Sequence, residues 1–528
     1  MATSPQRAYR AACPNCGAPV EFASAASASA VCSFCRSTLL RDGDALRRIG
    51  VSAELFDDHS PLQLGASGTR QGMGFTLVGR LQYGYEGGTW NEWHALFDNG
   101  RSAWLSEDNG AYVLAFDAPL PADVPPFDEL RAGQRLVADR RGWNVASVVR
   151  THLIAAEGEL PAPPRLQGDF FVIDLRNAEG EVATIDASDP GKPGWSVGRS
   201  VALSELALQG LKDGAEKTLK ARGIECPSCG SALEPKLSTT KSLSCGQCNS
   251  VVDISKGAGA DLEHYAQNNS GPGGLTPQIP LGSEGKLGLD GPPVPWQVVG
   301  YMERCDNADG ADDETTFWRE YLLFHRMSGF AFLVDAEDGW SWVRPLTGAP
   351  KATGETALWK GKAYRRRYEY AAKVTWVQGE FYWRLQRDET ARVADYEGTG
   401  SEAALRLSRE QTGSEVTWSA GRTLAADAVA EAFAIPGQNR RAMQRDVSPL
   451  ATGSSMGLAK GLVILFVVLI FIAMLAQCDG NDCDDTRMTF GEASAEYQQC
   501  LARRHSGSSG RSGGGSYGGW SSGGGGHK

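Results

Sequence analysis

The sequence lacks the short motifs that mark the best-known metalloproteases and nucleotide-binding enzymes. Neither an H-E-x-x-H nor a G-x-x-x-x-G-K-[ST] segment occurs in its 528 residues. Histidine is scarce as well, with seven residues scattered along the chain, among them His94 and His152. We therefore expect a protein that is not an enzyme, without catalytic or cofactor-binding residues.

A basic excess and an apolar leader are also missing. The 52 Lys and Arg residues are outnumbered by 63 Asp and Glu residues, which gives a net charge of −11. Phosphate contacts need a basic surface, so this balance argues against broad nucleic-acid binding. The stretch from Met1 to Cys13 has no apolar core, so we expect no cleavable signal peptide. An apolar fraction of 41% is that of an ordinary globular protein.

Cysteine, in contrast, is concentrated in two cassettes of identical spacing. The first consists of Cys13, Cys16, Cys32 and Cys35, and the second of Cys226, Cys229, Cys245 and Cys248. Two Cys-x-x-Cys turns joined by a hairpin supply the four thiolates of a tetrahedral zinc site. Each cassette therefore predicts a zinc ribbon, over residues 1–50 and 220–256, with one structural Zn²⁺ in each.

A redox dithiol or a disulfide pair is the alternative interpretation of these cysteines. A redox Cys-x-x-Cys, however, usually stands alone near a βαβ pattern, which this sequence does not show. Gly17 and Gly230 follow the first pair of each cassette, where the turn around the metal needs an easily bent backbone. Because cysteine fills all four ligand positions, no position remains for a substrate, and both sites are predicted to be structural.

Two long segments, 60–208 and 279–434, show short alternating apolar runs broken by Gly, Asp, Asn and Pro. This pattern predicts a mainly β protein with two β-rich domains, sandwich-like or barrel-like, separated by the second ribbon and a Gly-rich linker at 257–278. The segments are copies of each other. Trp90-Asn-Glu-Trp93 matches Trp318-Arg-Glu-Tyr321, Gly158-Glu159 matches Gly379-Glu380, and Trp195-Ser-Val-Gly-Arg199 matches Trp418-Ser-Ala-Gly-Arg422.

These three repeated motifs resemble a bacterial family, domain-of-unknown-function family 4178, in two tandem copies. The resemblance covers both β-rich segments. It implies ribbons and a membrane segment in the same chain, and genes that lie beside polyamine-synthesis-like enzymes and small membrane proteins. It implies no established activity and assigns no functional residues.

The repeated polar residues are candidates for a pocket or for structural pairs. Strand alternation places Glu92 and Glu320 on the apolar face of their strands, where an unpaired carboxylate is costly. They could line a pocket for a cation such as a polyamine. The alternative, which we favour, is a structural pair with Arg199 or Arg422. Glu159 and Glu380 have the same two interpretations, or they are solvated charges after a glycine turn.

Residues 456–477 form an almost uncharged apolar run, which predicts a C-terminal transmembrane helix. Basic residues precede the uncharged part of this run, which begins at Gly461: Arg440, Arg441, Arg445 and Lys460. The positive-inside rule then predicts a single-pass protein of the bacterial inner membrane with its N-terminal bulk in the cytoplasm. Segment 478–505 would be extracytoplasmic, and a disordered Gly/Ser tail would occupy 506–528. Outside the cytoplasm, Cys478, Cys483 or Cys500 could form a disulfide between two copies of the chain.

Together these patterns predict a zinc-stabilised docking or scaffolding platform at the membrane, with neighbouring membrane proteins as partners. A binder of polyamine-like cations, or an accessory to a polyamine-related enzyme, is the alternative. Nucleic-acid binding through the ribbons is a second alternative, which the net charge disfavours.

Overall fold

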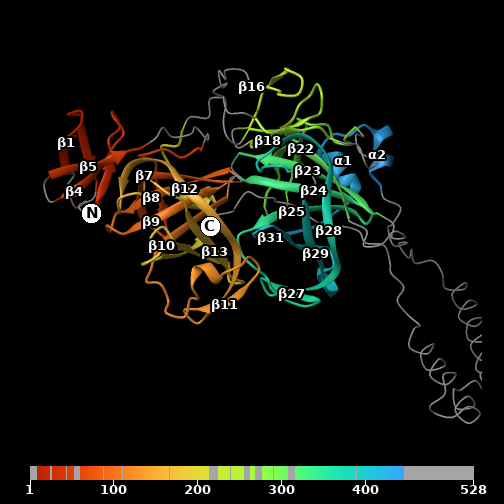
Figure 1. Cartoon of the computed structure of the whole chain (residues 1–528). Coiled ribbons are helices and arrows are strands. Elements are labelled where there is room, and N and C mark those ends of the chain that lie inside the picture. Colours follow the sequence, from red (N-terminus) through yellow and green to blue (C-terminus); the bar gives the residue numbers. More distant parts are fainter. Residues whose placement is uncertain are drawn as a thin grey trace, which may run out of the picture. The chain divides into compact units, whose positions relative to one another are not determined.

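The computed structural model describes residues 9–444 with short internal gaps. The gaps are 24–26, 43–44, 53–59, 87, 109–110, 166, 213–223, 238–239, 255–261, 268–275, 289–290, 307–314, 327 and 387–388. β-Strands dominate this part of the chain (Figure 1), which confirms the prediction of a mainly β protein.

The first copy closes into a ring of eight antiparallel strands. Around the ring the order is β7 (Met73–Tyr85), β8 (Gly88–Phe97), β9 (Ser102–Asp108), β10 (Ala111–Asp117), β15 (Gly194–Ser200), β14 (Glu181–Asp186), β13 (Phe170–Arg176) and β12 (Arg141–Leu160). Strand β12 pairs with β7, and this pairing closes the ring. Of the two predicted forms, the copy therefore takes the barrel.

Short elements extend or connect the strands of this ring. Strand β6 (Ser67–Arg70) pairs with β7, and β11 (Arg135–Ala138) pairs with β12. Two 3₁₀ helices lie at η1 (Phe127–Glu129) and η2 (Leu203–Leu206).

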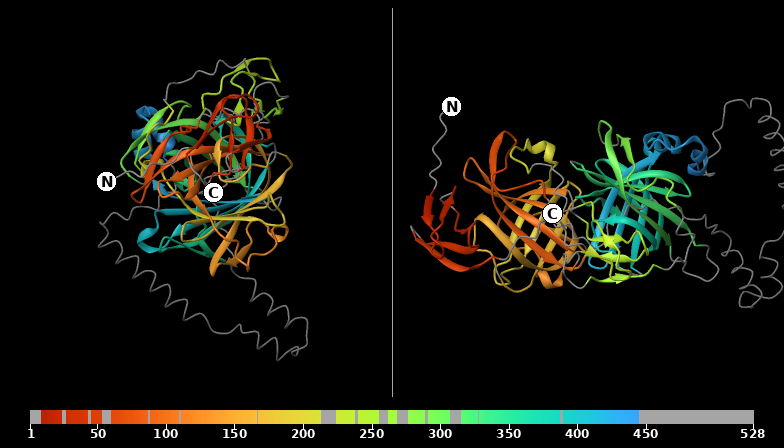
Figure 2. Two further views of the ribbon diagram at one scale, coloured as in Figure 1. Left: turned by 90° about the vertical axis from the view of Figure 1, so that its left-hand side faces the viewer. Right: turned by 90° about the horizontal axis from the view of Figure 1, so that it is seen from above.

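The second copy repeats this ring in the same order. Its strands are β22 (Val294–Asp306), β23 (Phe317–His325), β24 (Gly329–Ala336), β25 (Gly339–Leu346), β31 (Glu415–Leu424), β30 (Leu405–Thr412), β29 (Thr390–Gly398) and β28 (Lys362–Phe381). Strand β28 closes the ring on β22. Figure 2 shows the strands of both copies from two further directions.

This ring also carries short added elements. Strand β21 (Glu284–Leu287) pairs with β22, and the hairpin of β26 (Lys351–Thr353) and β27 (Thr356–Trp359) pairs with β28. The 3₁₀ helix η3 (Gly400–Glu402) links β29 to β30.

A small hairpin sheet precedes each ring. The first ribbon has strands β1 (Tyr9–Ala12), β2 (Pro19–Phe22), β3 (Ser29–Val31), β4 (Ser37–Asp42) and β5 (Ala45–Val51). The second has β16 (Ile224–Glu225), β17 (Ala232–Leu233), β18 (Ser242–Ser244), β19 (Val251–Asp253) and β20 (His264–Tyr265). In both, one Cys-x-x-Cys pair lies between the strands of each of two hairpins.

Apolar side chains on the outer face of each ring are covered by segments at the ends of the copy. In the second copy, two helices cover this face: α1 (Ala426–Ala432) and α2 (Gly437–Met443). Val429 of α1, the α1 C-cap residue Phe433 and Met443 of α2 belong to the same apolar cluster as Tyr321 and Leu333 of the ring. In the first copy, Leu203 and Leu206 of η2 are among the residues that do so. Side chains alternate along a strand, so the neighbours of these residues face the inside of the ring.

Among the described residues, no helix combines the length and apolarity that a membrane crossing requires. The predicted transmembrane segment 456–477, the segment 478–505 with its cysteines and the tail 506–528 all lie outside the described residues.

Candidate metal centres

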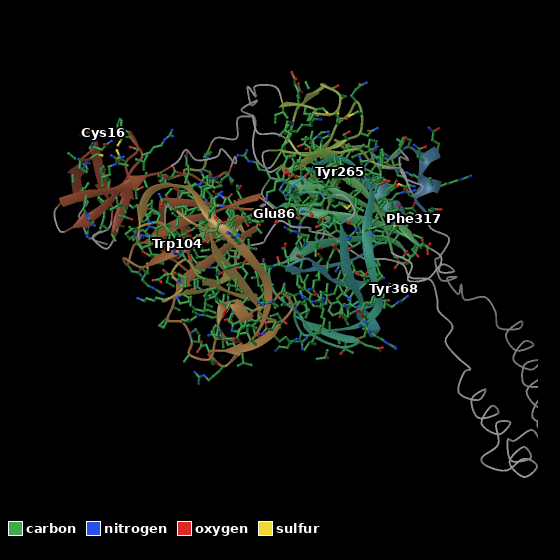
Figure 3. All side chains as sticks on the ribbon, viewed as in Figure 1. Cys16, Glu86, Trp104, Tyr265, Phe317 and Tyr368 are labelled. Atoms are coloured by element: carbon green, nitrogen blue, oxygen red, sulfur yellow. The ribbon has the colours of Figure 1, made fainter. Side chains whose placement is uncertain are left out.

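The four sulfur atoms of the first cassette converge at one point of the first ribbon. The Cys13 and Cys35 Sγ atoms are 3.6 Å apart, and those of Cys16 and Cys32 are 3.7 Å apart. All four lie within 4.8 Å of one another. Four sulfurs held 2.3 Å from a central ion in a tetrahedron would be separated by about 3.8 Å. The spacing fits a metal ion and is far longer than the ~2.05 Å of a disulfide bond. Figure 3 marks the cluster at Cys16.

The second cassette repeats this geometry. The Sγ atoms of Cys226 and Cys248 are 3.7 Å apart, as are those of Cys229 and Cys245. In both clusters the first cysteine of each pair is buried and the second is more exposed. Two four-cysteine clusters that could hold a metal ion are therefore present, each directly before one barrel.

Each pair of cysteines sits on a turn that passes through the left-handed backbone region. Gly17 and Gly230 have φ of +76° and +75°, and their N–H groups donate to the carbonyls of Cys13 and Cys226 at 2.8 Å. The predicted need for glycine at these two turns is confirmed. The second pair of each cassette has the same turn without glycine, since Arg36 and Asn249 have φ of 56° and 58°.

Hydroxyl groups favour the thiolate form of several of these cysteines. Hydrogen bonding to Ser37 lowers the pKa of the Cys35 thiol to about 5, and hydrogen bonding to Ser250 lowers the pKa of Cys248 to about 6. The thiolate is the form that binds metal. Each serine follows its cysteine by two residues. Other cysteines of the clusters shift in the opposite direction. Burial raises the pKa of Cys226 to about 12; the Ala18 backbone hydrogen bond lowers the pKa of Cys16, but the neighbouring thiols outweigh it and raise this pKa to about 12.

Each ribbon is joined to its own barrel by strand addition. In the first copy β3 pairs with the end of β12, with Ala30 opposite Glu159. In the second copy β18 pairs with the end of β28, with Leu243 opposite Glu380. The two rings therefore hold their ribbons in the same register.

The glutamate of the repeated Gly-Glu motif binds the ribbon to the barrel through hydrogen bonds, and we call Glu159 and Glu380 with these bonds the clamp. The Glu159 carboxylate accepts a hydrogen bond from the Ala23 backbone N–H. The Glu380 carboxylate accepts from the backbone N–H groups of Lys236 and Leu237 at 2.9 Å, and from the Thr240 hydroxyl at 2.5 Å. Ala23 and Lys236 stand the same number of residues after the first cysteine of their cassettes.

The interpretation of these glutamates as solvated charges is wrong. Glu159 and Glu380 are both buried, because each fills the space between a ribbon and its ring. The glycines before them, with φ of +70° at Gly158 and +88° at Gly379, leave no room for a side chain against the carbonyls of Val78 and Val299.

Glu320 is part of an ion-pair network that crosses the inside of the second barrel. Its carboxylate lies 3.4 Å from Arg304 Nη1, and it accepts a hydrogen bond from Trp318 Nε1 at 2.8 Å. Arg304 Nη2 also lies 2.9 Å from Glu410. Strand β22, which carries Arg304, and β30, which carries Glu410, are separated in the ring by β28 and β29. The pair can therefore meet only through the interior.

The predicted partners Arg199 and Arg422 are wrong. Arg422 is exposed, and the partner of Glu320 is Arg304. Arg199 pairs with Glu181 at 3.0 Å rather than with Glu92. Both arginines lie near the end of the last strand of their ring, where the chain leaves the barrel, and this places them away from the interior.

Glu92 occupies the position of Glu320 in the first barrel, but no arginine faces it from the position of Arg304. In the register of the strands, Arg304 lies opposite Trp318 and Tyr83 lies opposite Trp90, so Tyr83 is its counterpart. Burial, and then the charges of Glu92 and Asp186, raise the pKa of Tyr83 well above its usual value.

Arg304 and Glu410 could not be found from the sequence, because neither belongs to a repeated motif. Burial raises the pKa of Glu410 to about 8 and also raises the pKa of Glu320, while Arg304 opposes both shifts. Burial therefore disfavours the ionised form of both carboxyl groups, and the guanidinium of Arg304 compensates for part of that cost.

The stretch Gly194–Gly198 fits the G-x-S-x-G pattern of serine hydrolases, but its surroundings do not. Ser196 is buried in the middle of the antiparallel strand β15, opposite Thr184. A nucleophile of this class needs a sharp turn between a strand and a helix that exposes its hydroxyl. The pattern therefore carries no catalytic meaning here.

Comparison with known proteins gives one result. No curated protein and no solved structure matches the chain. The model of the family described as "Domain of unknown function (DUF4178)" matches residues 63–203 and 289–426. These two regions are the two barrels, and together they make up more than half of the chain. The chain therefore belongs to the DUF4178 family and carries two copies of its domain, each preceded by a four-cysteine cluster.

Proposed function

We propose that this protein is a non-enzymatic docking or scaffolding platform on the cytoplasmic face of a bacterial inner membrane, stabilised by two structural zinc ions. The observation that carries the proposal is the identical junction of both ribbons with their barrels. Three contacts would hold each ribbon in place: a metal ion between its cysteines, the pairing of one of its strands with a barrel strand, and hydrogen bonds to a buried glutamate. The ribbon would therefore be a rigid part of its unit. Such a unit presents fixed surfaces to a partner.

The chemistry of the clusters supports a structural role for the metal. Four thiolates complete the coordination of zinc and leave no position for a substrate or water. When bound, zinc would supply the folding free energy that a ribbon of this size cannot obtain from its own small core, on the order of 10–16 kcal/mol in comparable domains. The ligands would be the eight cysteines of the two clusters.

The location in the proposal rests on the sequence of segment 456–477 and its basic N-terminal flank. Reducing conditions in the cytoplasm would keep the cluster thiolates available for zinc, and neighbouring membrane proteins would be the partners. Single-cysteine labelling tests the orientation. A membrane-impermeant maleimide should modify Cys483 in intact spheroplasts and should not reach the cysteine of an Arg150→Cys variant, at an exposed position outside both clusters, until the membrane is opened.

Native-detergent affinity capture of the full chain tests the platform role. We expect a stoichiometric membrane-protein partner, and we expect it to be lost when the second cluster is removed by the Cys229→Ala substitution. The matched control is Cys305→Ala, which removes a buried cysteine of β22 outside both clusters. A chain that comes out alone, or a partner that is indifferent to Cys229→Ala and to the equivalent Cys16→Ala, would argue against the proposal.

One observation favours a second candidate, the binding of a small organic cation in the first barrel. Glu92 and Asp186 both act electrostatically on Tyr83 inside this ring, where the second barrel has the positive charge of Arg304. Calorimetry with spermidine separates the candidates. A saturable heat that is abolished by Tyr83→Arg would support a polyamine-like ligand, and the absence of heat at millimolar spermidine would remove it.

A further inference from the structure

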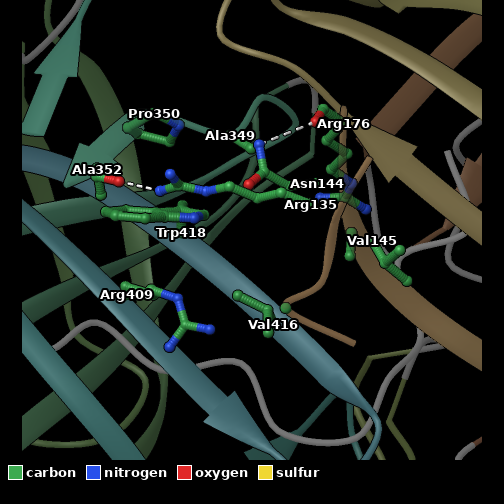
Figure 4. A pocket seen from close by; sticks show the side chains of 12 residues that line it. Arg135, Asn144, Val145, Arg176, Ala349, Pro350, Ala352, Arg409, Val416 and Trp418 are labelled. Carbon is green, nitrogen blue, oxygen red and sulfur yellow. Dashed lines mark hydrogen bonds between the residues drawn. The ribbon is translucent and has the colours of Figure 1, made fainter. Parts of the chain in front are cut away.

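A hollow lined by both barrels contains three arginines. Its volume is about 170 Å³. The first copy contributes Arg135 and Arg176, and the second contributes Arg409 together with Trp418. No aspartate or glutamate is among the described residues that line it. Figure 4 shows the three arginines around the hollow.

Strand register explains how these residues come together. Arg135 on β11 lies opposite Asn144 on β12, and Asn144 lies opposite Arg176 on β13. The three side chains therefore form one row across neighbouring strands. In the second copy, Arg409 on β30 lies opposite Trp418 on β31. The row of the first barrel faces this pair of the second.

The walls of the hollow are held by hydrogen bonds between the copies. The Ala349 N–H donates to the Asn177 carbonyl at 2.9 Å, and Arg176 Nη1 donates to the Leu346 carbonyl at 3.2 Å. Arg135 donates to the Ala352 carbonyl. A Cβ atom at Gly133 would lie 3.0 Å from Arg409 Nη2, so the glycine allows the guanidinium to approach the first barrel.

These bonds leave much of the donor capacity of Arg135 and Arg409 available. A guanidinium has five N–H donors, and a neutral carbonyl or amide does not balance its charge. Arg409 donates to the Gln411 side chain at 3.1 Å. Burial lowers the pKa of Arg409, and Arg135 acts in the same direction, although Glu369 and Tyr396 oppose them. A bound anion would offset the cost of holding these charges close together.

The arginines are specific to this junction and are not part of the repeated barrel. Register alignment of the copies places Thr356 at the position of Arg135 and Glu397 at that of Arg176. Because Trp195 matches Trp418, Ile185 stands at the position of Arg409. None of the three arginines therefore has an arginine at the matching position of the other copy.

We propose that this arginine-lined hollow binds a small anion with a phosphate group. Arginine recognises phosphate through paired N–H donors. Donors that approach from both barrels suit the tetrahedral phosphate group, which accepts in several directions, better than a planar carboxylate. The volume is below the ~300 Å³ of sites for drug-sized ligands, so the ligand is inorganic phosphate or the phosphate end of a small metabolite.

Calorimetry on the full chain in detergent, at constant ionic strength, tests the proposal with inorganic phosphate as the probe. We expect saturable binding with one site per chain. Arg135→Thr and Arg409→Ile, which install the residue of the other copy, should each weaken binding about tenfold or more. Arg150→Thr is the matched control, because Arg150 is an exposed arginine of β12 that pairs with Asp169 and does not line the hollow.

Three results would overturn the proposal: no saturable heat with millimolar phosphate, Arg135→Thr and Arg409→Ile binding as tightly as Arg150→Thr, or succinate binding in place of phosphate. Arg135 is exposed, so its substitution keeps the test decisive even if Arg409→Ile fails to fold. If phosphate binds but addition of phosphomonoesters does not displace it, the ligand is inorganic phosphate rather than a metabolite.

Discussion

The two barrels of this protein are alike where they hold their ribbons and differ inside. Both use a positive-φ glycine and a buried glutamate at the end of a twenty-residue strand, with the same register to the ribbon. Their interiors keep an acid at the positions of Glu92 and Glu320, but the residue that faces it is Tyr83 in one copy and Arg304 in the other. After duplication, the assembly of ribbon and barrel was kept while the interior chemistry diverged.

The largest effect is expected at the feature that both copies have in common, the four-cysteine cluster of each ribbon. Cys16→Ala and Cys229→Ala should each lower the metal content from two ions per chain to one, and the double variant should contain none. Each should also unfold its own ribbon, since zinc supplies on the order of 10–16 kcal/mol to such a unit. Elemental analysis and hydrogen exchange measure the two effects. Cys305→Ala is the control and should keep two ions; its loss of metal would contradict the assignment.

The next effect concerns the difference between the interiors. Arg304→Met should destabilise the second barrel by about 3–5 kcal/mol, because it leaves the carboxyl groups of Glu320 and Glu410 buried without their cation. Tyr83→Phe at the equivalent position of the first barrel should cost about 1 kcal/mol or less. Denaturant unfolding followed by hydrogen exchange in each barrel measures both. Equal costs would show that the network does not distinguish the copies.

Removing the charge of the clamp should have a smaller effect, of similar kind in both copies. Glu159→Gln and Glu380→Gln should each cost about 1.5–3 kcal/mol, the contribution of hydrogen bonds to a charged group. The expected signature is faster amide exchange at Ala23 in the first variant and at Lys236 and Leu237 in the second. Glu129→Gln, an exposed carboxylate of η1, should leave these amides unchanged. Protection that stays intact in both clamp variants would contradict the role.

The smallest effect is a pH dependence confined to the second barrel. The pKa of Glu410 is about 8 in the folded state and near 4.3 when unfolded, so the folded protein binds the proton more tightly. Stability from this group is complete below about pH 4.3 and is lost as the pH rises toward 8. Glu410→Gln should flatten the difference in Tm between pH 5 and pH 8. An unchanged slope would mean that Glu410 is ionised throughout.

The features that could be predicted from the sequence are those that a short local pattern of residues specifies. The cysteine spacing located both clusters, and the alternating runs with three repeated motifs identified two copies of one β domain. The sequence could not tell a sandwich from a barrel, because that depends on whether β12 pairs with β7 and β28 with β22, far along the chain. The transmembrane segment stays a prediction.

The repeated glutamates show why the partners of the buried charges could not be predicted from the sequence. The Gly-Glu pair was visible as a repeat, yet its meaning lies in backbone N–H groups of a ribbon more than a hundred residues earlier. Arg304 and Glu410 meet across the interior of a closed ring, and their counterparts in the first copy are different residues, so neither repetition nor spacing marks them.

By itself, the sequence determined that this chain has two four-thiolate clusters and a duplicated β domain, because cysteine spacing and strand alternation are local properties. Only the tertiary structure decided which side chains balance which charges: Glu320 with Arg304 rather than Arg422, the clamps on each ribbon, and three arginines around one hollow. Ring closure brings distant strands together at distances of a few ångströms, and the energy of a buried charge depends on those neighbours rather than on its place in the chain.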